Sequence, residues 1–287
     1  MSQPHSAPAA RTGSETFLRV LFGIFMAVIA IALLSKPELF AAVTVVVMLF
    51  AAREWHRMVR SPAQAAIADL QPIHIQTAIT TAAIACAVAA LVLRVVPAAF
   101  AFLAVGALAA FVLGQMRGDN PLWHAAGVFY LGLPALALVA LLIFAPQGAP
   151  GVLGLFLIVW ATDTGALVFG KLIGGRKIAP RISPGKTWAG TIGGSLTAAA
   201  VYGLYIAFFG FNVPLAVAFA LVFSIAAHGG DLFESLVKRR FGTKDSGGMI
   251  PGHGGVLDRM DSMFAASVVL ALLVFGLHFN PLFGGHA

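Results

Sequence analysis

Charged residues are scarce in this sequence, and their scarcity excludes an ordinary soluble protein. Only 10% of the 287 residues are Asp, Glu, Lys or Arg, whereas 60% are hydrophobic even without glycine. Soluble domains have about 25% charged and about 45 to 50% apolar residues, so this composition lacks the polar side chains of a water-facing surface. The mean hydropathy is +0.93. We therefore expect an integral membrane protein.

The sequence also lacks the residues of two common kinds of site. Its single cysteine, Cys86, allows neither an internal disulfide nor a zinc site with several cysteine ligands. The Gly-Lys-Thr triplet that ends at Thr187 is not part of a P-loop, because that motif requires a glycine where the chain has Pro180. Disulfide scaffolds and P-loop nucleotide-binding proteins are therefore excluded.

Long hydrophobic runs are abundant. A helix needs about 20 mostly apolar residues to cross a bilayer core about 30 Å thick. Cutting the sequence at clusters of charge, Pro and Gly predicts nine such segments: 16–35, 38–52, 74–93, 97–116, 122–145, 151–170, 188–209, 213–235 and 263–280. We predict an all-α polytopic membrane protein with a disordered cytoplasmic tail over 1–15. We expect residues 16–287 to form one membrane domain, with N-terminal spans at 16–150 and the candidate functional half at 151–287.

The basic residues predict the orientation of these segments. Cytoplasmic loops near the ends of spans carry the Lys and Arg excess. With nine spans, one set of loops holds only Lys36 and Arg94. The other set holds sixteen bases: Arg11, Arg19, Arg53, Arg57, Arg60, Arg117, Lys171, Arg176, Lys177, Arg181, Lys186, Lys238, Arg239, Arg240, Lys244 and Arg259. We therefore expect the N-terminus and the polar loops to face the cytoplasm of a bacterial inner membrane, with the C-terminus outside. The net charge of +7 is assigned to this orientation, and no nucleic-acid partner is expected.

Most polar residues lie between positions 160 and 262, which contain six of the eleven acids and ten of the eighteen bases. An ionisable residue near a bilayer core is costly, so it indicates a functional site by default. If the segment 231–238 is helical, four polar residues share one face at i, i+3, i+4 and i+7: Asp231, Glu234, Ser235 and Lys238.

Two further acids, Asp258 and Asp261, are three residues apart just before the last span. Carboxylates gathered at one membrane surface repel each other unless a cation lies between them. Mg²⁺ prefers oxygen ligands and typically takes one or two protein carboxylates together with substrate phosphates. We predict that Asp231, Asp258 and Asp261 bind Mg²⁺. The alternative is that Glu234 pairs with Lys238 along the helix and that Asp261 caps the last span.

Glycines and bases beside these acids indicate an anion site. The run 251–255 (Pro-Gly-His-Gly-Gly) is not a stable helix, and glycine backbone N–H groups can approach an anion closely. Lys186 and Thr187 precede a span whose N-terminus favours negative charge. Turn formation alone would also explain the glycines, but the neighbouring bases favour phosphate binding. Arg181 and Arg240 are assigned to topology and anionic lipids.

One stretch is specific enough to indicate a family. Residues 235–261 read SLVKRRFGTKDSGGMIPGHGGVLDRMD, which resembles the signature of phosphatidate cytidylyltransferases (CDP-diacylglycerol synthases) position for position. Upstream, Asp163, the element SPGKTW at 183–188 and the element GDLFES at 230–235 also resemble that family, so the likeness covers the C-terminal half. One departure is Ala189, which stands where the family usually has Glu.

The resemblance implies an enzyme that joins CTP and phosphatidic acid into CDP-diacylglycerol and pyrophosphate among membrane lipids. It implies Mg²⁺ in a site with two cation positions, and it leaves a homodimer open. The implied catalytic residues are Asp231, Lys238, Arg239, Lys244, Asp245, His253, Asp258, Arg259 and Asp261. The implied substrate contacts are Asp163, Ser183, Lys186, Thr187, Ser235, Gly252, Gly254 and Gly255. Among the eight histidines only His253 is placed like a functional residue, and it would orient or protonate a phosphate.

Two other functions stay open. Acids within membrane helices and glycine-broken helices also mark ion-coupled transporters, although the clustering of acids and bases toward one face argues against a carrier. A CTP-dependent enzyme that acts on another lipid phosphate could use a similar surface. The pattern Asp-Gly-x2-Ala-Arg of CDP-alcohol phosphotransferases is absent, which disfavours that class.

Overall fold

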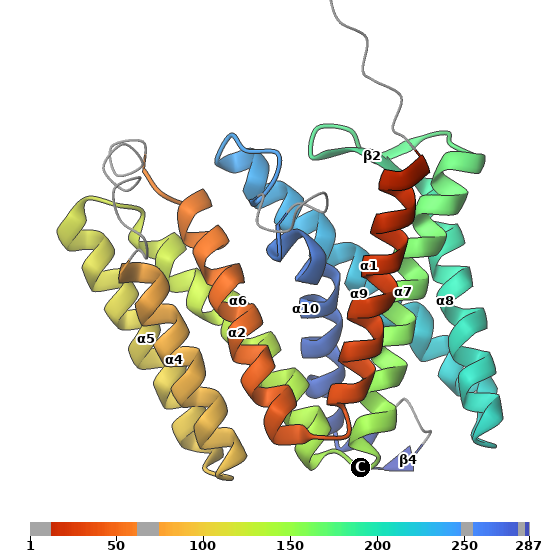
Figure 1. The fold of residues 1–287 in the computed structure, drawn as a ribbon, viewed down its shortest axis with the longest axis horizontal. Helices are drawn as coiled ribbons and strands as arrows, with labels where there is room; N and C mark the ends of the chain where they lie inside the picture. The colour runs from red at the N-terminus through yellow and green to blue at the C-terminus, as the bar shows by residue number, and fades with distance from the viewer. Residues whose placement is uncertain (1–12, 62–74, 248–254, 281–284, 287) are drawn as a thin grey trace, which may run out of the picture.

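The protein is a bundle of long helices that run side by side (Figure 1). The computed structural model describes residues 13–61, 75–247, 255–280 and 285–286. Within them the α-helices are α1 (Gly13–Leu33), α2 (Pro37–Met58), α4 (Ile75–Val92), α5 (Val96–Arg117), α6 (Pro121–Phe144), α7 (Gly148–Leu172), α8 (Trp188–Phe208), α9 (Val213–Arg240) and α10 (Leu257–Ala271). In the described part, eight helices are long and apolar enough to cross a membrane: α2, α4 to α9, and α10 together with the turn that follows it to Gly276. The described part of α1 contributes a shorter apolar stretch, Gly23–Leu33. The predicted all-α polytopic fold is confirmed.

Strands are short and lie at the two ends of the bundle. Between α7 and α8 the chain forms an antiparallel hairpin of β1 (Lys177–Ala179) and β2 (Ser183–Thr187). At the opposite end, α10 continues into a π-helical turn, η1 (Leu272–Gly276), which is followed by the antiparallel pair β3 (Phe279–Asn280) and β4 (Gly285–His286). The β1–β2 hairpin, the end of α9 and the start of α10 share one end of the bundle (Figure 1).

Several helices extend beyond the predicted hydrophobic segments. Helix α2 continues to Met58 instead of ending at residue 52, and α9 continues to Arg240 instead of 235. Helix α10 begins at Leu257, six residues before the predicted 263. Helix α1 begins at Gly13, within the expected tail, whose residues 1–12 lie outside the described part. The boundaries were wrong because hydropathy marks where lipid contact ends, whereas helices with polar ends packed on protein continue further.

Local sequence signals set the helix ends. Proline occupies the first turn of α2, α5, α6 and α9, where its missing N–H has no helical partner to lose. Thr187 caps α8 by accepting a hydrogen bond from the backbone N–H of Gly190 at 3.1 Å. Asn212 caps α9 through the N–H of Leu215, also at 3.1 Å. Gly118 ends α5 with φ of 61°, a left-handed conformation that glycine adopts without a Cβ penalty.

Helices α7 and α8 approach each other through small residues. A Cβ atom on Gly194 would lie 2.5 Å from the carbonyl oxygen of Thr162, and one on Gly165 would lie 2.6 Å from Oγ1 of Thr197. Glycine therefore lets these two backbones pack closely, as in other membrane helix pairs. This contact places β2, which leads directly into α8, beside the polar end of α7.

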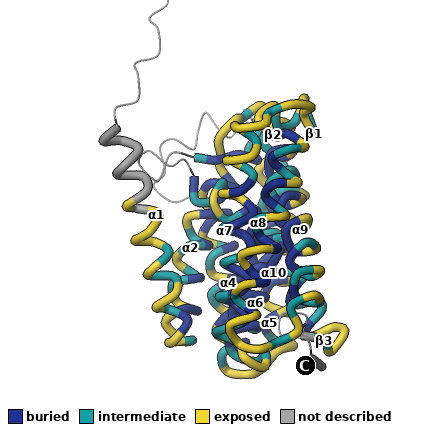
Figure 2. The backbone as a smooth tube through the Cα atoms, turned by 90° about the vertical axis from the view of Figure 1, so that its right-hand side faces the viewer, coloured by how far each residue is buried: buried dark blue, intermediate teal, exposed yellow. Residues whose placement is uncertain are grey.

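The buried core runs along the middle of the bundle, and the outer faces of the helices are exposed (Figure 2). Aromatic rings join the two halves of the chain at the core. The Trp55 and Tyr130 ring centroids are 4.8 Å apart, and the Tyr130 and Phe264 centroids are 5.7 Å apart in an edge-to-face arrangement. Helix α2 is therefore fixed against α6 and α10, next to the polar end of the bundle.

Candidate active site

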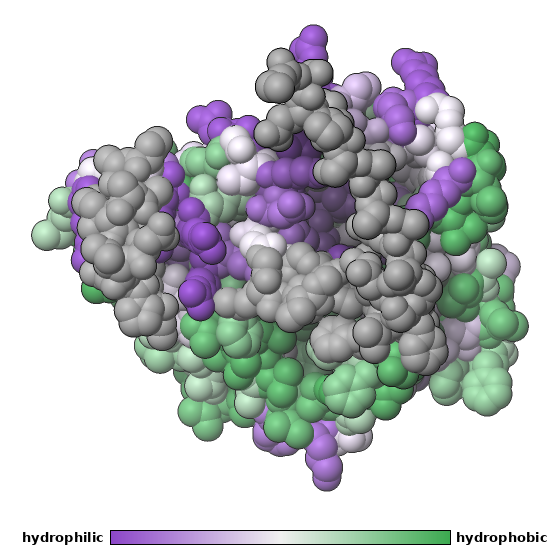
Figure 3. All heavy atoms as spheres, turned by 45° about the horizontal axis from the view of Figure 1, so that its top comes forward, coloured by the Kyte–Doolittle hydropathy of each residue, from purple (hydrophilic) through white to green (hydrophobic). Residues whose placement is uncertain are grey.

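A cavity of about 430 Å³ lies where β2 and the start of α8 meet α7, α9 and α10. Viewed toward this end, hydrophilic side chains gather around a hollow, while hydrophobic residues cover the flank below it (Figure 3). Seven charged residues line the cavity: Asp163, Lys186, Asp231, Lys238, Asp258, Arg259 and Asp261. All seven were predicted as site residues from the sequence, and the fold brings them together from four segments.

The polar face of α9 forms one wall, as the helical spacing predicted. Ser235 Oγ donates a hydrogen bond to Asp231 Oδ1 at 3.4 Å, and Lys238 Nζ lies 3.3 Å from Glu234 Oε1. Glu234 is fully buried. Its contact with Lys238 is the pairing along the helix that the sequence offered as an alternative to metal binding. These contacts confirm that the four residues share one face of the helix.

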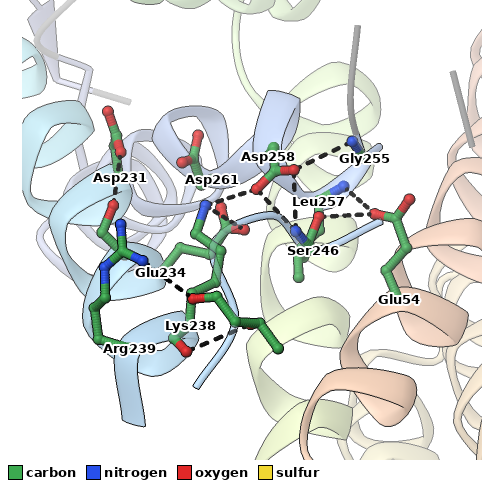
Figure 4. Close-up of polar contacts among 12 residues, drawn as sticks. Glu54, Asp231, Glu234, Lys238, Arg239, Ser246, Gly255, Leu257, Asp258 and Asp261 are labelled. Carbon is green, nitrogen blue, oxygen red and sulfur yellow. Dashed lines mark hydrogen bonds and ion pairs between the residues drawn. The ribbon is translucent and has the colours of Figure 1, made fainter. Parts of the chain in front are cut away.

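Asp258, in the first turn of α10, is held by several donors (Figure 4). Lys238 Nζ donates to Asp258 Oδ1 at 2.6 Å. The backbone N–H of Ser246 lies 3.2 Å from Oδ2, and that of Gly255 lies 3.1 Å from Oδ2. Both oxygens of Asp258 are therefore occupied by donors from α9 and from the segments before α10.

Lys186 reaches the cavity from β2. Its ammonium group forms an ion pair with the carboxylate of Asp231 on α9. A second contact joins α9 to the turn between β1 and β2, because Arg239 Nε donates to the carbonyl oxygen of Ile182 at 3.1 Å. The β1–β2 hairpin is thus attached to the end of α9, and this attachment brings a base to the carboxylate face of the cavity.

Negative charge exceeds positive charge where Asp163, Asp231 and Asp261 meet. These three carboxylates lie close enough for their charges to interact, and Lys186 interacts with all three. Ser262 supports two of them, since its Oγ lies 3.4 Å from Asp163 Oδ1 and its N–H lies 2.6 Å from Asp261 Oδ1. Oxygen ligands with uncompensated negative charge suit a hard divalent cation such as Mg²⁺.

The carboxylates are not preassembled as a complete metal site. Within the described residues, no group of three or more His, Cys, Asp or Glu side chains is arranged to hold a metal ion. Among the described residues the protein side chains therefore supply only part of a Mg²⁺ coordination shell, and phosphate oxygens of a substrate would supply further ligands, as is usual for this ion. The assignment of Mg²⁺ to Asp231, Asp258 and Asp261 stays a prediction.

Thr187, another predicted site residue, also lines the cavity, whereas the other predicted site residues of the described part do not. Arg239 is bound to backbone oxygens of Ile182 and Thr243. Ser235 contacts Asp231, and Gly255 contacts Asp258. The remaining residues outside the lining are Ser183 in β2 and the exposed Lys244 and Asp245. Three predicted residues, Gly252, His253 and Gly254, lie outside the described part of the chain.

Comparison with known proteins agrees with the motifs at this cavity. The model of a family described as the cytidylyltransferase family matches residues 17–277. The chain belongs to the cytidylyltransferase family. The match extends over both halves, so membership of this family includes α2 and the other N-terminal helices, which motif analysis left as apolar spans.

Several members of the family are similar over part of the chain. A protein of Brucella suis biovar 1 (strain 1330) named phosphatidate cytidylyltransferase is 49% identical over 154 residues, which cover 52% of this chain and 56% of that protein. A phosphatidate cytidylyltransferase of Staphylococcus aureus (strain COL) is 47% identical over 131 residues, 45% of this chain and 50% of that one. The chain thus spans about half the length of the curated relatives that it matches.

Sequence reasoning missed one acid beside the cavity. Glu54 of α2 hydrogen-bonds to the start of α10, although it belongs to none of the motifs described above. The sequence did contain one signal for it. An acid at the end of a span, between Arg53 and Trp55, is energetically costly to bury unless it has hydrogen-bond or charge partners. Identifying those partners required the fold, because they lie more than 190 positions away in the chain.

Proposed function

We propose that the protein is a phosphatidate cytidylyltransferase, which transfers the cytidylyl group of CTP to phosphatidic acid. The observation that carries this proposal is the cavity, where Lys186, Lys238 and Arg259 alternate with carboxylates at one end of a membrane bundle. Both proposed substrates are anionic, and bringing two phosphates together requires cations that compensate their charge. The end of a membrane bundle is also where a lipid phosphate and a water-soluble nucleotide can meet.

The chemistry requires positioning more than proton transfer. An oxygen of the phosphatidate phosphate would attack the α-phosphorus of CTP, forming one P–O bond. The bond from the α-phosphorus to the bridging oxygen would break, and pyrophosphate would leave with that electron pair. A phosphomonoester has a second pKa of roughly 6 and is largely deprotonated near neutral pH, so a strong base is unnecessary. Lys186 and Arg259 would bind phosphate oxygens and orient them for this displacement.

Mg²⁺ would supply further neutralisation of the charge that develops on the phosphates. Asp231 and Asp261 would hold it, because both carboxylates line the cavity, and Asp231 would exchange its ion pair with Lys186 for the metal ion. Asp258 would join them only after release from Lys238, since its oxygens already accept hydrogen bonds from Lys238 and two backbone N–H groups. The second predicted cation position stays unassigned.

The apolar helices support a setting among membrane lipids. We propose that the cavity end faces the cytoplasm of a bacterial inner membrane, because most of the Lys and Arg residues of the described part belong to helix ends and connections at that end. The C-terminus would then lie outside. A homodimer stays a prediction that the mass of the purified protein in nanodiscs would test.

Two rival functions predict different results in vesicle-transport and product-formation assays. An ion-coupled transporter would move its substrate across sealed vesicles, whereas the location of the cavity toward one end favours an enzyme. A CTP-dependent enzyme acting on another lipid phosphate would prefer that lipid. We would incubate the purified protein with CTP, Mg²⁺ and, in turn, phosphatidic acid, lysophosphatidic acid or a polyprenyl phosphate. A CDP-lipid product from phosphatidic acid supports the proposal; product only from another lipid, or vesicle flux without product, contradicts it.

A further inference from the structure

Glu54 is a buried acid that the proposed reaction does not use directly. It lies near the C-terminal end of α2, and its side chain is only 4% exposed. The carboxylate points toward Ser246 and Leu257 at the start of α10 (Figure 4). A buried carboxylate without partners would be costly, so its contacts explain its presence.

Three donors surround this carboxylate. The backbone N–H of Val256 donates to Oε1 at 3.0 Å, and that of Leu257 donates to Oε2 at 2.8 Å. Ser246 Oγ donates to Oε2 at 3.2 Å. Hydrogen bonds that involve a charged acceptor are stronger than those between neutral groups. Glu54 therefore joins α2 to two segments, one before and one after the stretch 247–255.

These contacts make Glu54 the N-terminal cap of α10. The first N–H groups of a helix have no partner within the helix, and a carboxylate placed there also interacts favourably with the helix dipole. Val256, at the N-cap position, makes no side-chain capping bond of its own. The cap is supplied instead by a residue about 200 positions earlier in the chain.

The backbone is shaped to receive this side chain. A Cβ atom on Gly247 would lie 2.7 Å from Oε1 of Glu54, and its three nearest atoms would all belong to Glu54. A Cβ on Gly255 would come too close to Ser246 Oγ and to Glu54 Oε2, the latter at 2.6 Å. At these two positions, glycine makes room for the carboxylate of Glu54. This gives a packing reason for Gly255, which was predicted to contact substrate.

We propose that Glu54 is a positioning residue for the catalytic end of α10. The first two turns of this helix carry Asp258, Arg259 and Asp261, which line the cavity. Ser246 links the two carboxylates, because its N–H binds Asp258 and its Oγ binds Glu54. Glu54 thus fixes from α2 where these three side chains lie. The catalytic part of this inference rests on the proposed function; the capping part does not.

A steric double-mutant cycle tests the geometry directly. Because the three atoms nearest to the Cβ added by Gly247→Ala all belong to Glu54, this substitution should be much more harmful when Glu54 is present than when it is absent. We expect Gly247→Ala to lower kcat by about tenfold in the natural background and by less than about twofold in Glu54→Ala, a coupling expected only of residues in contact. Equal effects of Gly247→Ala in the two backgrounds would overturn the proposal.

Glu54→Gln removes the charge with little change in size, and Glu38→Gln is its matched control, since Glu38 is exposed at the other end of α2. We expect Glu54→Gln to lower kcat of the folded, monodisperse protein by about tenfold, as for loss of a charge-assisted hydrogen bond, and Glu38→Gln to leave it unchanged. A merely structural role would instead lower the yield and the melting temperature, with kcat of the folded protein retained; that result would overturn the proposal.

Amide hydrogen exchange in nanodiscs separates this inference from the proposed function. Glu54→Gln should accelerate exchange at Val256 and Leu257 by about tenfold, because their N–H groups lose a charged acceptor, while Glu38→Gln should not. If the wild type makes no CDP-lipid but this exchange effect is present, the function is wrong and the cap stands. If the wild type is active and the exchange is unchanged, the cap is wrong.

Discussion

At the scale of single residues, charged side chains that line the cavity already form ion pairs with one another. Lys186 pairs with Asp231, and Lys238 contacts both Glu234 and Asp258. These pairs hold the bases inside the cavity, and an incoming phosphate would compete with carboxylates for them. The shared face of Asp231 and Lys238 could be predicted, because helical spacing is local. The partners of Asp258 and Glu54 could not, because they depend on segments that meet only in the fold.

Substitutions of Lys186 and Arg259 distinguish phosphate binding by individual side chains from binding by a generally positive surface. We expect Lys186→Ala and Arg259→Lys each to lower kcat/KM by at least about tenfold, since a charge-assisted hydrogen bond contributes roughly 1.5 to 3 kcal/mol and lysine lacks the planar donor set of arginine. Arg181→Ala is the control, because Arg181 is an exposed base outside the cavity lining and should change kcat/KM less than about threefold. Similar losses in all three variants would show a diffuse electrostatic surface instead. The measurement is steady-state formation of the CDP-lipid in liposomes.

At the scale of elements, polar contacts at helix ends determine how the bundle is assembled. Hydropathy located the helices but ended α2 at residue 52, before the acid that caps α10. A second set of polar contacts joins α2, α4 and α6. Nδ1 of His56 lies 2.8 Å from Nδ1 of His124, and Nε2 of His56 lies 2.7 Å from Oγ1 of Thr80. His124 also contacts Asp119 at 2.9 Å in the turn before α6. Neither the cap of α10 by Glu54 nor the contacts around His56 have a sequence signature, because their members come from separate segments of the chain.

Asp119 should stabilise the protein in a pH-dependent way. Burial alone would raise the pKa of Asp119, but hydrogen bonds from His124 and from the N–H groups of Ser61 and Asn120 lower that pKa below its usual 3.8. Because the folded-state pKa is lowered, the ionised carboxylate stabilises the fold above about pH 4, and this contribution is lost as the pH falls further. Asp119→Asn should therefore lower the melting temperature at pH 7, and the difference from wild type should shrink toward pH 3. A difference that is constant with pH would contradict this account.

At the scale of the whole molecule, the chain places its polar loops at one end of a hydrophobic bundle. The turn between α1 and α2 lies at the opposite end from the loop after α9 (Figure 1). Composition and the distribution of Lys and Arg were sufficient to predict this arrangement, since both are properties of the whole chain. They were insufficient for the cavity itself, whose shape depends on close packing of α7 on α8 and on the cap that α2 supplies.

The orientation can be tested with single cysteines in a Cys86→Ala background. Thr243→Cys reports on the cavity end, and Ser35→Cys reports on the α1–α2 turn. An impermeant thiol reagent should label Ser35→Cys in intact spheroplasts and Thr243→Cys only after the membrane is opened. The reverse pattern of labelling would overturn the proposed orientation. Unchanged activity of both variants would show that the substitutions preserve the fold.

The most direct measurement of the central claim follows the phosphorus atoms of CTP. The purified protein would receive phosphatidic acid, Mg²⁺ and CTP labelled at either the α- or the γ-phosphate. The account predicts that the α-label enters the lipid, that the γ-label is released as pyrophosphate in equal amount, and that chelation of Mg²⁺ stops both. Transfer of the γ-label to lipid, or release of labelled phosphate without a labelled lipid, would contradict cytidylyl transfer.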